Sequence, residues 1–240
     1  MDFGFSDEQQ AIKETAREML AKRSPLAAVR QAAESRTYDD ALWKEICDLG
    51  WPGIAIAEDD GGQGLGMVEL VILCEELGYA CAASPFQSNA AAGLFIQHAG
   101  SAEQRGHWLA GVASGEARGA AAFAPRSNDL VPDAQGAAIL VLNGGDGAVL
   151  AEPGDADVEP VELIDATRAY ARVSVSGGDA LEGEVEAGRS IVLITHIGSV
   201  ADRIQNVLLI QPDGAGGSTT KWLDEEERFE LGADLDLAVP

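Results

Sequence analysis

Residues 42–80 read LWKEICDLGWPGIAIAEDDGGQGLGMVELVILCEELGYA, and the first half of the fold can be built outward from this stretch. Residues 42–49 carry leucine and isoleucine at helical spacing and lead to Gly50, a residue type common just after a helix. Residues 58–66 are rich in glycine and predict a tight turn with positive φ angles. Residues 67–79 form an apolar run of helical length. The stretch therefore predicts a helix, a tight turn and a strongly apolar second helix.

Helix signals also lie on both sides of this stretch. Ser6 is a typical N-cap residue, and the acidic residues that follow it are favoured near the positive end of a helix dipole. Pro25 can open a second helix, because its missing N–H costs no hydrogen bond in the first turn. Asp39 provides an N-cap for the helix that ends at Gly50. Two further apolar segments with helical character are residues 86–98 and 102–111.

From residue 119 onward the apolar residues occur in short runs separated by turn signals such as Asn-Gly and Pro-Gly-Asp, which is typical of strands. The runs are residues 137–142, 148–151, 171–175, 191–195 and 207–211. Helices followed by strands predict an α+β protein rather than an alternating βαβ sheet. We expect an all-α helical domain over residues 1–118 and a β-barrel-like or β-sandwich domain over residues 119–240.

The chain has 240 residues, 16 of them Lys or Arg and 40 Asp or Glu, for a formal net charge of −24. Such a charge argues against binding to nucleic acid and to anionic membranes, which repel a negative surface. No apolar run approaches the roughly 20 residues that a membrane helix needs, and the N-terminus lacks the pattern of a signal peptide. We therefore expect a cytoplasmic protein.

Other chemical motifs are weak. Gly62, Gly64 and Gly66 do not have the spacing of a dinucleotide-binding loop, and residues 58–60 and 224–227 are best read as solvated acidic segments. The three histidines form no catalytic triad, and the three cysteines form no Cys-x-x-Cys pair. The residues alone thus predict no metal site and identify no catalytic residue.

Four segments, taken in order, resemble the N-terminal half of the acyl-CoA dehydrogenase family. They are MDFGFSDEQQAIKETAREML (1–20), residues 42–80 quoted above, SPFQSNAAAGLFIQHAG (84–100) and SAEQRGHWLAGVASGE (101–116). The resemblance covers residues 1–118. It implies an α-helical N-terminal domain, a β-barrel-like middle domain and a C-terminal helical bundle, with FAD bound between the last two.

The resemblance also implies an oxidoreductase that removes an α-proton from an acyl-CoA thioester and transfers a β-hydride to FAD. Such a reaction needs a carboxylate base, donors that polarise the thioester carbonyl and a dry apolar slot. Residues 67–79 and 86–98 would form the wall of this slot. Ala90, Gly93 and Leu94 are the candidate substrate-binding residues, although ordinary core packing is the better explanation for any single one of them.

The β half departs from the family pattern at the flavin site. Where the family has Thr-Glu-Pro followed by Gly-Ser-Asp, this chain has Phe-Ala-Pro-Arg-Ser-Asn-Asp at residues 123–129. The cofactor-binding residues implied by the resemblance are Phe123, Ala124, Ser127, Asn128 and Thr195. The sequence departs further after about residue 187, where the C-terminal bundle and its catalytic carboxylate have no counterpart.

Three hypotheses follow. The first is an FAD-dependent acyl-CoA dehydrogenase of fatty acid or lipid metabolism that needs another chain to complete its active site. The second is a non-catalytic partner subunit in a heteromer with a full-length acyl-CoA dehydrogenase. The third is an inactive remnant of such an enzyme. The expected partners are an acyl-CoA substrate and either further copies of the chain or the full-length subunit.

Overall fold

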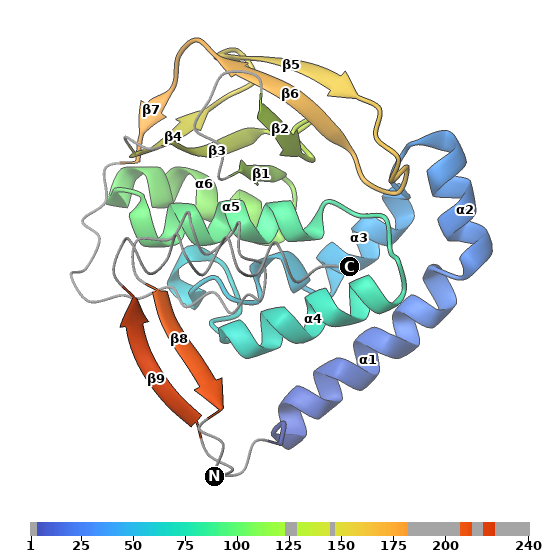
Figure 1. Ribbon diagram of the computed structural model, residues 1–240. Helices are drawn as coiled ribbons and strands as arrows, with labels where there is room; N and C mark the ends of the chain where they lie inside the picture. Colours follow the sequence, from blue (N-terminus) through green and yellow to red (C-terminus); the bar gives the residue numbers. More distant parts are fainter. Residues whose placement is uncertain (1–3, 123–128, 145–146, 182–206, 213–217, 224–240) are drawn as a thin grey trace. The chain divides into compact units, whose positions relative to one another are not determined.

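The computed structural model describes residues 4–122, 129–144, 147–181, 207–212 and 218–223 (Figure 1). The chain divides into two compact units, Met1–Val185 and Glu186–Pro240. In the first unit, helices precede strands along the chain, which confirms the predicted α+β class. The change from helix to strand falls between Ser114, the last residue of the final helix, and Gly119, the first residue of the first strand.

The helices begin and end close to their predicted positions. They are α1 (Asp7–Arg23), α2 (Leu26–Ser35), α3 (Asp40–Asp48), α4 (Met67–Tyr79), α5 (Phe86–Ala99) and α6 (Ala102–Ser114). Ser6 caps α1, because its hydroxyl accepts a hydrogen bond from the Gln9 N–H at 3.2 Å. Asp39 caps α3 through the Ala41 N–H at 2.8 Å. None of the described helices combines the length and the apolar character that crossing a membrane requires.

The turn between α3 and α4 depends on glycine, as predicted. It contains the short 3-10 helices η1 (Trp51–Gly53) and η2 (Glu58–Asp60), and Gly61 and Gly64 have φ angles of +87° and +66°. At Gly62 the constraint is close packing, because a Cβ atom there would lie 2.1 Å from the carbonyl oxygen of Ile56. These glycines thus have structural roles, and the turn brings the end of α3 back to the start of α4.

The strands of the first unit form two sheets. One has the order β1 (Gly119–Ala122), β3 (Ile139–Gly144), β4 (Gly147–Ala151) and β7 (Asp179–Ala180), and the other has the order β2 (Asp129–Pro132), β6 (Tyr170–Val175) and β5 (Ala156–Val161). Strands β1 and β3 are parallel, and all the other pairs are antiparallel. One apolar cluster takes residues from both sheets, including Leu140 of β3 and Val173 of β6, so the two sheets pack face to face.

The second unit contains one described element, the antiparallel hairpin of β8 (Val207–Pro212) and β9 (Ser218–Leu223). The predicted strand at 207–211 corresponds to β8. The runs at 137–142, 148–151 and 171–175 correspond to β3, β4 and β6 of the first unit. The run at 191–195 lies outside the described residues.

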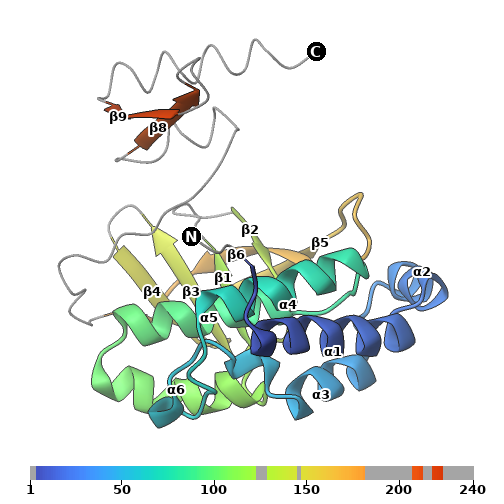
Figure 2. The ribbon, with the colours of Figure 1, turned by 90° about the horizontal axis from the view of Figure 1, so that it is seen from below.

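Helix α5 lies between the other helices and the sheet that contains β1 (Figures 1 and 2). One side of it, with Phe86 and Ala90, joins a core built from α1, α3 and α4. The other side, with Ala92 and Ile96, joins a second core that includes α6 and β3. Because α5 contributes to both cores, the helical part and the strands of the first unit form one packed body.

The packing at Gly62 predicts opposite effects for two glycine-to-alanine substitutions. Gly62→Ala should destabilise the protein by about 1–3 kcal/mol or more, because the new methyl group meets backbone atoms that cannot move aside. Gly106→Ala, in the interior of α6 with no atom within 4 Å of the new Cβ, should stabilise it by about 0.5–1 kcal/mol. Thermal unfolding of both variants measures the difference, and equal melting temperatures would contradict this account of the turn.

Candidate functional site

The candidate site is the wall formed by α4 and α5, where the predicted substrate-binding residues lie. Ala90 is buried in the core shared with α1, α3 and α4. Gly93 is also buried, and a Cβ atom there would lie 2.9 Å from Cδ1 of Ile56. Leu94 is half-buried at the edge of the same core. Close packing thus explains the small residues at 90 and 93, and Leu94 alone of the three keeps accessible surface; a role in binding an acyl group stays a prediction.

Helix α4 is apolar around most of its circumference. Leu70, Leu73 and Leu77 are buried against the other helices. On the opposite side, Met67, Val68, Val71, Cys74, Glu75, Gly78 and Tyr79 are exposed or half-buried, and they share one face at 3.6 residues per turn. We call these seven residues the outer face of α4. A helix that is apolar on nearly all sides is usually covered on all sides.

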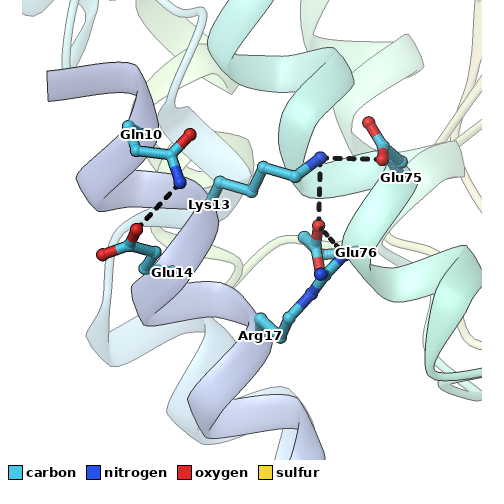
Figure 3. A network of polar contacts seen from close by, with 6 residues as sticks. All are labelled: Gln10, Lys13, Glu14, Arg17, Glu75 and Glu76. Atoms are coloured by element: carbon cyan, nitrogen blue, oxygen red, sulfur yellow. Dashed lines mark hydrogen bonds and ion pairs between the residues drawn. The ribbon is translucent and has the colours of Figure 1, made fainter. Parts of the chain in front are cut away.

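A charged network holds the inner side of α4 to α1 (Figure 3). Glu76 has no exposed surface, and its two carboxylate oxygens accept hydrogen bonds from Nε and Nη2 of Arg17 at 2.8 and 2.9 Å. The ammonium of Lys13 lies 3.3 Å from Glu76 and 2.7 Å from Glu75. The planar Arg17 guanidinium also stacks over the Tyr79 ring at 4.8 Å. Two cations of α1 and two carboxylates of α4 therefore neutralise one another where the two helices meet.

The electrostatics of Glu76 follow from this arrangement. Burial raises the pKa of its carboxyl group, but the hydrogen bonds and charges of Arg17 and Lys13 outweigh burial, so the pKa lies below its usual value. Glu76 is thus held in its ionised form with both oxygens occupied. A carboxylate engaged in this way is not available as a general base.

A second buried carboxylate, Asp133, links the helices to the sheets. It follows β2 and has a φ angle of +58°, which is uncommon outside glycine. Its oxygens accept hydrogen bonds from the hydroxyls of Tyr38, which precedes α3, and Ser88 of α5. The Tyr38 oxygen in turn accepts the Ala169 N–H at 3.0 Å, and the Asp133 N–H donates to the Ala169 carbonyl at 2.9 Å. The cluster therefore joins four segments of the first unit.

Burial dominates the electrostatics of this cluster. It raises the pKa of Asp133 despite the hydrogen bonds from Ser88 and Tyr38 and the nearby charge of Arg168. Burial and the adjacent carboxylate also raise the pKa of Tyr38 far above its usual value, so its hydroxyl stays protonated and keeps donating. Both carboxylate oxygens of Asp133 accept hydrogen bonds, so the cluster has a structural role. We call Tyr38, Ser88 and Asp133 the clasp.

A cavity of about 260 Å³ opens beside this clasp, at the end of α4 and the start of α5. Its lining includes Cys74 and Gly78 of the outer face of α4, Phe86 and Gln87 of α5, and Arg168. Within the described part of the chain, the guanidinium of Arg168 lies 3.8 Å from Asp133 and 3.5 Å from Gln87, and its buried Nε has no hydrogen-bond partner there. The cavity lining thus combines apolar side chains with polar ones, among them Asp165, Thr167 and Arg168.

The five residues predicted to hold FAD, Phe123, Ala124, Ser127, Asn128 and Thr195, lie outside the described residues. The strand that leads to the first of them, β1, ends in three buried alanines, whose side chains cannot hydrogen-bond a cofactor. In the described part of the chain, no three His, Cys, Asp or Glu side chains come together in a way that could hold a metal ion.

The sequence analysis did not identify the Tyr38–Ser88–Asp133 clasp. Its members are 95 and 45 residues apart along the chain, and none belongs to a recognisable motif. The sequence offers one local hint, a Pro-Asp pair at 132–133 that ends a strand where a turn begins. That hint indicates a turn and carries no information about partners.

Comparison with known proteins shows which fold the helices belong to. Residues 6–116 match the model of the acyl-CoA dehydrogenase N-terminal domain. The chain is 32% identical over 169 residues to the acyl-CoA dehydrogenase IpdE2 of Mycobacterium tuberculosis, an alignment that covers 70% of this chain and 51% of that protein. The chain thus spans about half the length of this relative.

Solved structures show the same similarity. A chain of the Tcur3481–Tcur3483 steroid ACAD (G363A variant) superposes with a TM-score of 0.65 at 26% identity, over 73% of this chain and 57% of that one. A chain of the ChsE4–ChsE5 complex from Mycobacterium tuberculosis gives 0.64 at 18% identity, over 75% and 57%. The second similarity is one of fold.

The buried network at α1 and α4 predicts a pH-dependent loss of stability. Glu76→Gln should lower the free energy of unfolding by about 1.5–3 kcal/mol near neutral pH, because charge-assisted hydrogen bonds are lost. The pKa of Glu76 is lowered in the folded state, so the stabilisation is present above the usual carboxyl pKa and is lost as the pH falls through the lowered value. Urea unfolding from about pH 7 into acid should show the two proteins converging.

The matched control is Glu75→Gln on the same helix. Glu75 pairs with Lys13 but is largely exposed, so this substitution should change stability little at any pH. If Glu75→Gln cost as much as Glu76→Gln, burial of the Glu76 carboxylate would not be the source of the effect.

The clasp predicts a difference between two tyrosines. Tyr38→Phe should destabilise the protein by about 1–3 kcal/mol, because it removes a donor from buried Asp133 and the acceptor of the Ala169 N–H. Tyr79→Phe should have almost no effect, since the Tyr79 side chain is exposed and its ring remains beneath Arg17. Chemical unfolding of both variants tests this, and an unchanged midpoint for Tyr38→Phe would exclude a stabilising role for the clasp.

Proposed function

The chain belongs to the acyl-CoA dehydrogenase family through residues 6–116, and we propose that it is an acyl-CoA dehydrogenase-like flavoprotein whose active site is completed by another chain. The reaction would be the α,β-dehydrogenation of an acyl-CoA thioester. The observation that carries the proposal is the family's N-terminal domain itself, folded as six helices with the apolar α4–α5 wall in place.

The contribution of this chain would be to bind and enclose the acyl group. The wall of α4 and α5 is apolar, and Leu94 offers it a half-buried contact surface. An apolar wall excludes water, which strengthens the electrostatic interactions that stabilise charge at the thioester. The acyl-chain class would depend on the residues that close this wall from the other side.

The α-proton requires a carboxylate base, and the buried carboxylates of the described region are already engaged. Glu76 is ion-paired with Arg17 and Lys13, and Asp133 is hydrogen-bonded to Tyr38 and Ser88. We propose that another chain supplies the base. FAD, when bound, accepts the β-hydride, and Ser127, Asn128 and Thr195 are the polar side chains of this chain proposed to contact it.

A non-catalytic partner subunit is the second candidate. Phe123 and Ala124 stand where the resemblance implies threonine and glutamate, and neither side chain can make the hydrogen bonds of the residues it replaces. Two of the solved relatives are named as pairs of gene products, Tcur3481–Tcur3483 and ChsE4–ChsE5. In this alternative the chain keeps the fold and supports a full-length subunit that performs the chemistry.

The proposal includes the setting of the reaction. We place the protein in fatty acid or lipid metabolism in the cytoplasm, as a homo-oligomer or as a heteromer with a full-length acyl-CoA dehydrogenase. The strongly negative net charge of −24 is consistent with a protein that does not bind nucleic acid or anionic membranes.

The visible absorption spectrum of the purified protein tests the proposal. The spectrum is recorded for the chain alone and after co-expression with the full-length acyl-CoA dehydrogenase encoded nearest to it. The enzyme proposal predicts flavin absorption that bleaches when an acyl-CoA is added, at a flavin content above that of the full-length protein alone. Bound flavin at the level of the full-length protein alone would favour the partner-subunit role. If the chain is colourless alone and after co-expression, and forms no complex with the full-length protein, both the enzyme proposal and the partner-subunit proposal are refuted.

A further inference from the structure

We infer that the cavity beside the clasp receives the acyl tail, the end of the acyl group remote from the thioester, and that Arg168 and Ser84 select tails with a neutral oxygen acceptor such as a ketone. This inference rests on the proposed function, because it names the class of acyl group that the α4–α5 wall would enclose. The cavity measures about 260 Å³. Since one water molecule takes up about 30 Å³ in the liquid, there is room for a few carbon atoms and one oxygen.

An open stripe along α5 leads to this cavity. Gln87, Ala91 and Leu94 keep accessible surface, and their spacing of four and three residues puts them on one face of the helix. The residues between them, 88–90 and 92–93, are buried. Gln87 also lines the cavity, so the stripe ends at the cavity wall, roughly 10 Å along the helix axis from Leu94. An acyl group that lies against this stripe therefore reaches the cavity with its tail.

Part of the cavity lining suits a hydrocarbon chain. Leu77 of α4 and Phe86 of α5 line the cavity and are buried, and Ala82 lies in the segment between these helices. Removing hydrocarbon from water against such surface is favourable, because apolar area is lost from the solvent. The carbon atoms of the tail thus have a place beside these side chains.

The polar part of the lining contains two groups whose hydrogen-bonding capacity is unused within the described part of the chain. Ser84 is 5% exposed and lines the cavity, and no described residue forms a hydrogen bond with its hydroxyl. Arg168 has a buried Nε without a partner among the described residues. Its other nitrogens lie 3.5 Å from Gln87 and 3.8 Å from Asp133, beyond the usual range of about 2.7–3.2 Å. Buried polar groups are normally paired, so a ligand that brings an oxygen acceptor satisfies donors that the described chain leaves unsatisfied.

The charges around Arg168 favour a neutral acceptor over a carboxylate. Asp133 lies beside the guanidinium, and Asp165 lines the same cavity. Hydrogen bonds from Thr167 and the charge of Arg168 lower the pKa of Asp165, which favours its ionised form. A carboxylate on the acyl tail would be a third acidic group beside one guanidinium. A ketone adds no charge and still accepts a charge-assisted hydrogen bond.

Binding of three CoA thioesters to the purified protein tests the inference. Octanoyl-CoA has no tail oxygen, its keto derivative carries a carbonyl next to the terminal methyl group, and octanedioyl-CoA ends in a carboxylate. We expect the keto thioester to bind about 10-fold more tightly than octanoyl-CoA, the gain of one hydrogen bond to a charged donor. We expect octanedioyl-CoA to bind no more tightly than octanoyl-CoA. Isothermal titration calorimetry measures all three affinities.

Substitutions assign the preference to residues. Arg168→Met keeps the apolar stem but removes the donors, so it should abolish the preference for the keto thioester and leave the affinity for octanoyl-CoA unchanged. Ser84→Ala should reduce the preference about 3-fold, and it removes a hydroxyl that no described residue uses. The matched control is Arg172→Met, at an exposed arginine of β6, which should change neither affinity. Circular dichroism and the melting temperature check that all three variants remain folded.

Infrared spectroscopy of the bound keto thioester gives a readout that does not depend on affinity. A hydrogen bond weakens the C=O bond, so the stretching frequency of an isotopically labelled ketone should fall on binding. The same band should stay at its value in an apolar solvent when the thioester is bound to Arg168→Met. An unshifted band in the unsubstituted protein would show that the ketone oxygen has no donor, which overturns the inference.

The outcomes separate the inference from the proposed function. Equal affinity for the keto thioester and octanoyl-CoA, tightest binding of octanedioyl-CoA, or a preference that survives Arg168→Met overturns the inference and leaves the proposed function standing. A preference for the keto thioester that depends on Arg168, found in a colourless protein, leaves the inference standing and refutes the flavoprotein proposal. Binding of none of the three thioesters refutes both.

Discussion

The burial of Glu76 is the constraint on which the arrangement of the helices depends. A carboxylate with no exposed surface must be paired, and here Arg17 and Lys13 of α1 supply the partners. This pairing fixes the rotation of α4 about its own axis, because Glu76 has to point toward α1. Once the rotation is fixed, the leucines of α4 face the core and Val68 and Val71 face outward.

Helix α5 connects the other helices with the strands of the first unit. Residues 90–93 in its middle are all alanine or glycine, so neighbouring backbones approach it closely: a Cβ on Gly119 of β1 would lie 2.5 Å from the Ala92 methyl group. The Asp133 clasp reinforces the contact with hydrogen bonds from Tyr38 and Ser88. Because both packing and a buried polar cluster connect the helices with the sheets, the helical part of the chain does not behave as a separate body.

The helices were predictable because their signals are local. Capping residues, apolar spacing and glycine at the turn lie within a few residues of the structure they specify, and α4 has the predicted bounds. Strands that are short apolar runs next to turn signals, such as β3 and β4, were also predicted, whereas β1, with the sequence GAAA, has no such run to detect. Its strand conformation comes from parallel pairing with β3, which joins residues 20 positions apart. Predictions for the flavin contacts concern residues outside the described region and stay predictions.

The sequence by itself determined the family, the order of helices and strands and the apolar character of the α4–α5 wall. The family follows from the resemblance of four ordered segments, and the other two can be read from periodicity and short local signals. Only the tertiary structure decided that Ala90 and Gly93 are packed in the interior, that Glu76 and Asp133 are engaged by distant partners, and that one side of α4 lies open. The physical reason is that burial and ion pairing depend on contacts between segments 45 to 95 residues apart, and helical periodicity shows which residues share a face but not what covers that face.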